Sequence, residues 1–191
     1  GTTGTLTSGT DFDLRSGTVS AALGGAVGAD KTTAGSVTLS GTNTYTGTTA
    51  VASGTLVLSG GTAVPDTGDV TVASGATLSL TASETVGSIA GPAGSAVALG
   101  ANTLTTGGGA KTFSGVIAGS GGLVLTGASS FTLAGANTFT GLTDVQGGIL
   151  TLNGGAAIAD TAAVQVAAAA GIVLGANETI GSLAGAGDVT L

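Results

Sequence analysis

The feature that most constrains the fold of this chain is an internal repeat without gaps. Residues 43–91 align with residues 137–185 at a constant offset of 94, and 26 of the 49 aligned positions are identical. Weaker flanks extend the two copies to 34–91 and 128–185. Repeats of this kind are typical of modular architectures in which each unit stacks on its neighbour. We therefore expect residues 1–191 to form one continuous repeat structure, a fragment of a longer repeat protein, with no internal domain boundary.

The composition of the chain excludes several classes of protein. Glycine accounts for 38 of 191 residues and hydrophobic residues for 42%, while charged residues make up 7% and aromatic residues 3%. Disorder requires low hydrophobicity and high net charge, and collagen requires glycine at every third position, so neither fits. The frequent glycines also disfavour helix, because each costs about 1 kcal/mol relative to alanine. The remaining small, aliphatic and β-branched residues favour strands.

Short runs of alternating apolar and polar residues predict where those strands lie. Each run is bounded by Gly, Ser, Asn or Asp. The runs are residues 36–40, 55–59, 69–73, 76–80, 96–99, 122–126, 130–134, 149–152, 163–167 and 171–174. Alternation indicates that one side of each strand is buried and the other side faces solvent.

The spacing of these runs predicts the architecture. Leu39, Leu58, Leu80 and Leu99 occupy comparable places in successive runs, 19, 22 and 19 residues apart. A meander of hairpins would return after roughly 8–12 residues. A return after about 20 residues suits one coil of a parallel β-solenoid with three short strands per turn. We expect an all-β rod of roughly nine rungs, about 4.8 Å apart and on the order of 40–45 Å long, with residues 91–94 and 106–110 as corners.

Two segments share a motif of specific order and spacing. Residues 37–47 read VTLSGTNTYTG and residues 131–141 read FTLAGANTFTG, and each precedes a short aliphatic run. These segments resemble the autotransporter-associated β-strand repeat, and the resemblance covers about residues 34–191. It implies a right-handed parallel β-helix in the passenger region of a Gram-negative autotransporter or large adhesin, secreted to the cell surface. It also implies a translocator barrel elsewhere in the full chain, and it supplies no catalytic motif.

Charge and missing residue types narrow the function further. The net charge is −7, and only Arg15, Lys31 and Lys111 are basic, so no basic patch for nucleic acid can form. The chain has no Cys and no His, which excludes thiolate zinc sites and Ser–His or Cys–His nucleophiles. No apolar run approaches the roughly 18 residues of a membrane span. We expect no enzyme activity, no catalytic, cofactor-binding or metal-binding residues, no cofactor, and no membrane insertion of this segment.

The N-terminal acidic residues are one candidate for chemistry. Asp11 and Asp13 would project from the same side of a strand, with Arg15 beyond them and Phe12 turned inward. A carbohydrate-active β-helix with calcium would use clustered carboxylates and a basic residue in this way. The structural alternative, which we favour, is the solvated outer side of a strand.

Two other acidic positions recur in both copies. Asp66 recurs as Asp160, and we expect it to bond its own backbone at a turn. Its neighbour Asp69 has no acidic counterpart, so the carboxyl pair of a glycosidase is not maintained. Glu84 recurs as Glu178, and we expect both to be exposed corner residues.

Uncharged residues in register are expected to be structural. Each asparagine before a short strand can tolerate left-handed backbone and form a ladder with an asparagine above it. Tyr45 and Phe139 share a register and are expected to fill gaps in the core. Threonine pairs suggest ice binding, but they do not recur on every rung. The asparagines are Asn43, Asn102, Asn137 and Asn177, and the threonine pairs are Thr44/Thr46, Thr103/Thr105 and Thr138/Thr140.

The sequence therefore favours a structural or adhesive segment of a secreted, cell-surface passenger. Such a segment would act as a stiff β-helical stalk or as part of a self-associating extracellular filament, as in a biofilm. Its partners would be other copies, met end to end or laterally, or a host or matrix surface. A carbohydrate-active β-helix enzyme and a calcium-binding or ice-binding solenoid are the alternatives.

Overall fold

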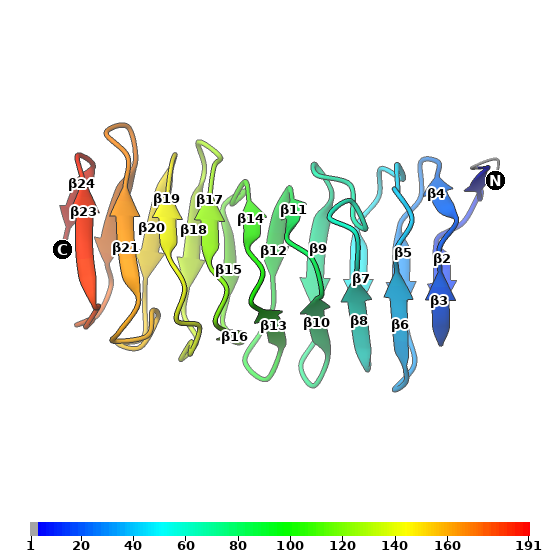
Figure 1. The fold of residues 1–191 in the computed structure, drawn as a ribbon, viewed down its shortest axis with the longest axis horizontal. Helices are drawn as coiled ribbons and strands as arrows, with labels where there is room; N and C mark the ends of the chain where they lie inside the picture. Colours follow the sequence, from blue (N-terminus) through cyan, green and yellow to red (C-terminus); the bar gives the residue numbers. More distant parts are fainter. Residues whose placement is uncertain (1–3) are drawn as a thin grey trace.

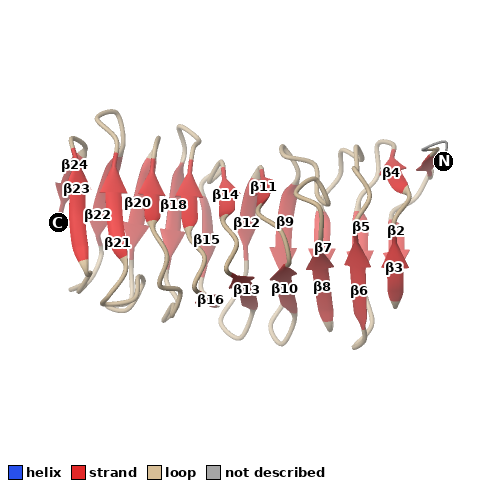
Figure 2. Cartoon of the chain, viewed as in Figure 1, coloured by secondary structure: helices blue, strands red, loops and turns tan. Residues whose placement is uncertain are grey.

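The computed structural model describes residues 4–191 as a rod of short stacked strands, with the two termini at opposite ends (Figure 1). Figure 2 shows only strands and loops along this described part of the chain, and no helix. The strands pair in parallel through about nine turns of about 20 residues each. The prediction of an all-β parallel solenoid is therefore confirmed.

Each coil contributes to three faces, and face one has the longest ladder. Its two sheets are joined by a single bridge between Gly91 and Phe113. The first sheet contains β2 (Phe12–Leu14), β5 (Ala29–Lys31), β7 (Thr49–Val51), β9 (Asp69–Val72) and β12 (Ser88–Ala90). The second contains β15 (Lys111–Phe113), β18 (Ser130–Leu133), β20 (Ile149–Leu152), β22 (Gly171–Leu174) and β24 (Asp188–Thr190).

The N-terminal part of face two is a regular sheet, and so is the C-terminal part of face three. Face two contains β3 (Gly17–Val19), β6 (Ser36–Leu39), β8 (Thr55–Leu58), β10 (Thr77–Leu80), β13 (Ala96–Gly100) and β16 (Val116–Gly119). Face three contains β1 (Thr5–Thr7) and β4 (Ala22–Gly24), then β11 (Glu84–Val86), β14 (Leu104–Thr106), β17 (Leu123–Leu125), β19 (Thr143–Val145), β21 (Ala163–Val166) and β23 (Ser182–Gly185).

Extended segments outside regular strands complete the remaining coils. Residues 43–46 and 62–64 lie on face three, and residues 137–140, 156–158 and 177–180 lie on face two. The first segment of each group still bonds the coil below it, because Thr44 N donates to Leu23 O at 2.7 Å and Thr138 N to Ile117 O at 2.9 Å. Residues 91–94 and 107–110 connect consecutive strands, so both are corners; the predicted corner 106–110 begins one residue too early, because Thr106 ends β14.

Columns of aliphatic side chains fill the narrow interior. On face two, one column is at most 1% exposed, and its members pair rung by rung. That column is Val37, Leu56, Leu78, Val97 and Ile117. Tyr45 and Phe139 are fully buried, as predicted, and the Tyr45 ring lies 6.5 Å from that of Phe12. Because each rung buries its side chains only against its neighbours, stability is approximately a sum over adjacent coils.

The second copy of the repeat is rotated about the rod axis by one face relative to the first, so equivalent strands lie on different faces. β8 lies on face two, but its counterpart at an offset of 94, β20, lies on face one. Likewise β7 on face one corresponds to β19 on face three. The chain makes four turns and passes two further faces between β8 and β20. Equivalent core residues thus point inward in both copies, while equivalent outer residues point in different directions.

Candidate functional site

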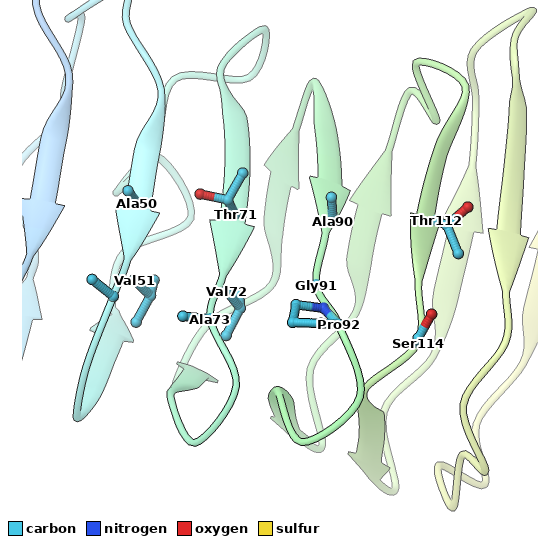
Figure 3. Close-up of a pocket in the computed structure, with 11 residues that line it drawn as sticks. Ala50, Val51, Thr71, Val72, Ala73, Ala90, Gly91, Pro92, Thr112 and Ser114 are labelled. Carbon is cyan, nitrogen blue, oxygen red and sulfur yellow. The ribbon is translucent and has the colours of Figure 1, made fainter.

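A groove on face one crosses β7, β9, β12 and β15, and it is the candidate contact site (Figure 3). Its volume is about 520 Å³. Two rows of small outward side chains line it, in register from strand to strand. One row is Ala50, Thr71, Ala90 and Thr112, and the other is Ala52, Ala73, Pro92 and Ser114. No residue that lines the groove is charged, so the groove can accept apolar surface.

The floor of the groove includes Gly91, which allows close packing of adjacent coils. A Cβ atom at this position would lie 2.9 Å from the backbone oxygen of Val72, as well as 2.5 Å from Ser95 Oγ and 2.8 Å from Phe113 Cε2. Those distances are shorter than real Cβ contacts, so the site requires glycine. Gly91 is also the residue that bridges to Phe113, where the two sheets of face one meet.

The groove belongs to the first copy and is not a requirement of the fold. The positions of Ala50 and Ala52 are occupied in the second copy by Asp144 and Gln146, on face three. Gln146 Nε2 donates to Asp144 Oδ2 at 2.7 Å, so long polar side chains fit at these positions without changing the strand. The same backbone therefore supports a small apolar surface in one copy and a polar surface in the other.

Charged residues lie on both sides of the groove along the rod. Asp30 is the in-register neighbour of Ala50 on the coil before it. Burial, and then the carboxylates of Asp11 and Asp13, raise the pKa of Asp30. At the other end, Lys111 Nζ lies 3.5 Å from Asp69 Oδ2 in a half-exposed ion pair.

The N-terminal acidic residues form a hydrogen-bonded strand surface. Asp13 accepts from Thr32 Oγ1 at 2.6 Å and from Arg15 Nε at 2.7 Å, and these two bonds, the first most strongly, lower the pKa of Asp13. Asp11 Oδ1 accepts from Gly28 N at 2.6 Å. Within residues 4–191, no three Asp or Glu side chains are grouped so that they could hold a metal ion.

The turn prediction for Asp66 is wrong in its detail. Asp66 and Asp160 are exposed, but within residues 4–191 neither side chain makes a hydrogen bond. The backbone closes the first turn instead, because Gly68 N donates to Pro65 O at 2.7 Å. Asp69, three residues further along, accepts from Ser88 Oγ at 2.7 Å on the next coil.

The prediction that Glu84 is an exposed corner residue is also wrong, because Glu84 is only 2% exposed. Its Oε1 accepts from Val64 N at 2.7 Å. Glu178 is half-buried, and its Oε1 accepts from Ile158 N at 2.7 Å. Both glutamates point into the solenoid because residues 62–64 and 156–158 form no regular ladder. A side-chain oxygen supplies the missing acceptor.

Two asparagines complete these irregular coils from the other side. Asn43 Oδ1 accepts from Leu23 N and Asn43 Nδ2 donates to Ala63 O, both at 2.7 Å. Asn137 repeats this pattern with Ile117 N and Ala157 O. The asparagines are structural, as predicted, but they bond backbone on the neighbouring coils and not a second asparagine.

The other two asparagines differ from this pair. Asn102 Nδ2 donates to Leu80 O and Leu99 O, both at 3.1 Å, which fixes the corner after β13. Asn177 is exposed.

The threonine rows do not form a continuous ladder. Thr112, Thr132 and Thr151 pair on consecutive rungs of face one, but Ala90 precedes them and Val173 follows them. The row is therefore interrupted. Thr105, one of the threonines considered for ice binding, pairs with Thr85 on one side but with Val124 on the other, so its row is interrupted too.

Sequence reasoning missed the buried Lys31. Its side chain is 0% exposed, and Nζ donates to Thr33 O, to Thr33 Oγ1 at 3.2 Å and to Ser53 O at 3.1 Å. The signal was available in the alternation, since Lys31 is in register with Leu14 and Val51, which both point inward.

Comparison with known families identifies the repeat. Residues 30–58, 118–132 and 123–152 match the model of the passenger-associated-transport-repeat. These segments are similar to that repeat, and the match does not extend over the rest of the chain. The matched segments contain Asn43 and Asn137, whose side chains stabilise the irregular coils of each repeat. The resemblance to autotransporter passenger repeats is thus confirmed over these segments.

Other comparisons add no relative. A search of the curated proteins gives no match, and neither does a search of the solved structures. Among residues 4–191, no helix has the length and apolar character that crossing a membrane would require.

Proposed function

We propose that this chain is a stiff spacer and contact segment in the passenger region of a secreted protein displayed on the surface of a Gram-negative cell. The passenger-associated-transport repeats support the surface location, and the parallel ladders support stiffness along the rod. Its function is mechanical: the stacked coils set a length, and the outer side chains set what the rod contacts.

The observation that carries this proposal is the one-face turn between the copies. A binding array needs equivalent side chains on one side of the rod, whereas here β8 and β20 are equivalent and lie on different faces. Outer residues also differ between copies, as at Ala50 and Asp144, while buried pairs such as Leu56 and Leu150 are identical. The repeat therefore maintains stacking and not a repeated binding face.

The acidic residues support a structural role over a carbohydrate-active one. A glycosidase needs a carboxyl group with a raised pKa beside a second carboxylate in an open cleft. Glu84 has a raised pKa but is buried in the core. Asp30 has a raised pKa beside Asp11 and Asp13, but Asp13 is held ionised by Thr32 and Arg15, and no residue that lines the groove is a carboxylate.

Changing the number of repeats tests the spacer function. Deleting residues 43–136 joins Thr42 to Asn137, so the second copy continues the coil at the equivalent position. The rod should shorten by about 22 Å with an unchanged cross-section in small-angle X-ray scattering, and duplicating the same residues should lengthen it equally. A change in cross-section, or loss of the β circular dichroism signal in both variants, would refute the spacer model.

We also propose a lateral contact, in which the groove of one rod packs against the groove of a second, antiparallel molecule of the same chain. A two-fold axis through Thr71 places Asp30, two coils before it, opposite Thr112 of the second molecule, two coils after it, and so beside Lys111. The two opposite charges would then pair twice across the interface, with the small residues of both grooves between them. End-to-end stacking through unpaired edge strands is the alternative mode of association.

Substitutions taken from the second internal repeat, which holds Asp144 and Gln146, test this contact. Ala50→Asp with Ala52→Gln fills the groove with side chains that the same backbone already supports. Sedimentation should show association of the native chain, weakened in this variant and in Lys111→Glu, and restored when Asp30→Lys is added to Lys111→Glu. Thr105→Asp on face three is the charge control. Association that all variants retain would indicate end-to-end stacking and refute the lateral contact.

A further inference from the structure

The two copies of the repeat treat one recurring carboxyl group differently. Glu178 receives two backbone hydrogen bonds, from Ile158 N at 2.7 Å and from Ala157 N at 3.0 Å. Glu84 receives only the equivalent of the first, from Val64 N. Its second oxygen, Oε2, is buried and has no hydrogen-bond partner. The same side chain is thus fully bonded and half-buried in one copy, and half-bonded and fully buried in the other.

Among residues 4–191, no positively charged group acts on Glu84. Asp66, in the loop beneath it, is the titratable group that acts on Glu84, and Glu84 in turn raises the pKa of Tyr45, one coil further away. On the other side, its paired strand β14 contributes only Leu104, Thr105 and Thr106.

The protonation energetics follow from this placement. Burial raises the pKa of Glu84, Asp66 adds to the effect, and the N–H groups of Val64 and Ala63 oppose it. The Ala63 N–H acts as a dipole only, since it completes no hydrogen bond to Oε2. Burial raises the pKa of Tyr45 to about 12, so the phenol stays neutral wherever Glu84 titrates.

We propose that Glu84 makes closure of the loop formed by residues 60–68 depend on pH: the loop packs on the solenoid when Glu84 is neutral and opens when Glu84 is ionised. An ionised carboxylate with an unbonded buried oxygen can gain hydrogen bonds only from water, and water reaches it when the loop moves away. The loop holds Val64 N, the partner of Glu84, and carries the exposed Asp66. The second copy lacks this response because both oxygens of Glu178 are already bonded.

Hydrogen exchange at two amides of the same molecule tests the proposal. Val64 N and Ile158 N are equivalent donors, to Glu84 and Glu178 respectively. After correction for intrinsic exchange rates, protection of the Val64 amide should fall with rising pH from the ordinary carboxyl pKa of 4.5 up to the raised pKa of Glu84. The fall should be up to about tenfold per pH unit, as expected for release of one proton. Protection of the Ile158 amide should stay constant.

Two variants separate the proton effect from a general loosening of the rod. Glu84→Gln keeps an oxygen for Val64 N but cannot ionise, so protection of the Val64 amide should become independent of pH. Glu178→Gln should leave the Val64 response unchanged. Parallel pH responses at Val64 and Ile158 in the native chain, or a pH response that persists in Glu84→Gln, would overturn the proposal. Neither readout depends on rod length or association, so the proposed spacer function is tested separately.

Discussion

Tyr45 and Thr49 share a buried hydrogen bond of 2.6 Å between Tyr45 Oη and Thr49 Oγ1, and the second copy keeps only half of this pair. Phe139 replaces the tyrosine, and the hydroxyl of Thr143 is left buried without a partner. A buried hydroxyl without a hydrogen bond costs about 1–3 kcal/mol relative to one that is satisfied. The tyrosine of the first copy would therefore supply the hydrogen bond that Thr143 lacks in the second.

Phe139→Tyr should restore the missing hydrogen bond and stabilise the chain. The expected gain is about 1 kcal/mol in the free energy of unfolding, measured from denaturant midpoints. Thr143→Val, which removes the unsatisfied hydroxyl, should also stabilise. The double variant should lose the gain of the tyrosine, because its hydroxyl would then have no partner. A Phe139→Tyr variant less stable than the native chain would contradict this account.

Leu150→Asp should destabilise the rod strongly. Leu150 is 0% exposed in the face-one column between Phe131 and Ile172. A buried carboxylate without a partner costs several kcal/mol, so the thermal midpoint should fall sharply or the chain should not fold. The adjacent Ile149 points outward at 45% exposure, and Ile149→Asp should change stability by less than about 1 kcal/mol. Equal effects of the two substitutions would mean that the strand register is wrong.

The free energy of unfolding should depend on pH because of Glu84. Because burial raises its pKa in the folded chain, the bound proton contributes stability that is complete below the unfolded pKa of about 4.5. This contribution is lost as the pH rises through the folded pKa. Glu84→Gln should therefore be more stable than the native chain at pH 7 and similar to it at pH 4. Urea unfolding at both pH values measures this difference, and equal stability at pH 7 would contradict it.

Lys31 should be important for the coil that it closes. Lys31→Met keeps the aliphatic stem but leaves Thr33 O and Ser53 O without the ammonium donor. The expected cost is about 1–3 kcal/mol. Lys111→Met, at a half-exposed surface pair, should cost less than about 1 kcal/mol. Chemical denaturation of both variants measures these costs. A Lys31→Met variant as stable as the native chain would show that the two carbonyl groups find other hydrogen-bond donors.

The sequence predicts the architecture well because the core is periodic. Leu39 pairs with Leu58, and Leu58 with Leu80, at the spacings read from the alternating runs. The alternating pattern does not predict short strands whose alternation is weak, such as β12 and β15. Their positions are fixed by the coil on either side and not by their own residues.

The burial of Glu84 and Lys31 follows from their register with neighbouring coils and not from residue type alone. Glu84 and Lys31 look like solvated residues, and only the register with inward-facing neighbours reveals that they point into the rod. The turn between copies, by contrast, was implicit in the offset of 94, which is not a whole number of coils of about 20 residues. The groove depends on which small residues become adjacent on face one, and that follows only once the register is known.

The one-face turn sets a long period for any array of such units. A given side chain would return to the same side only after three copies, which span 14 turns or roughly 67 Å along the axis. Equivalent patches would wind around the rod as a helix with a step of about 22 Å. A flat surface beside the array would therefore meet only every third copy of a patch, while a partner that encircles the rod would meet them all.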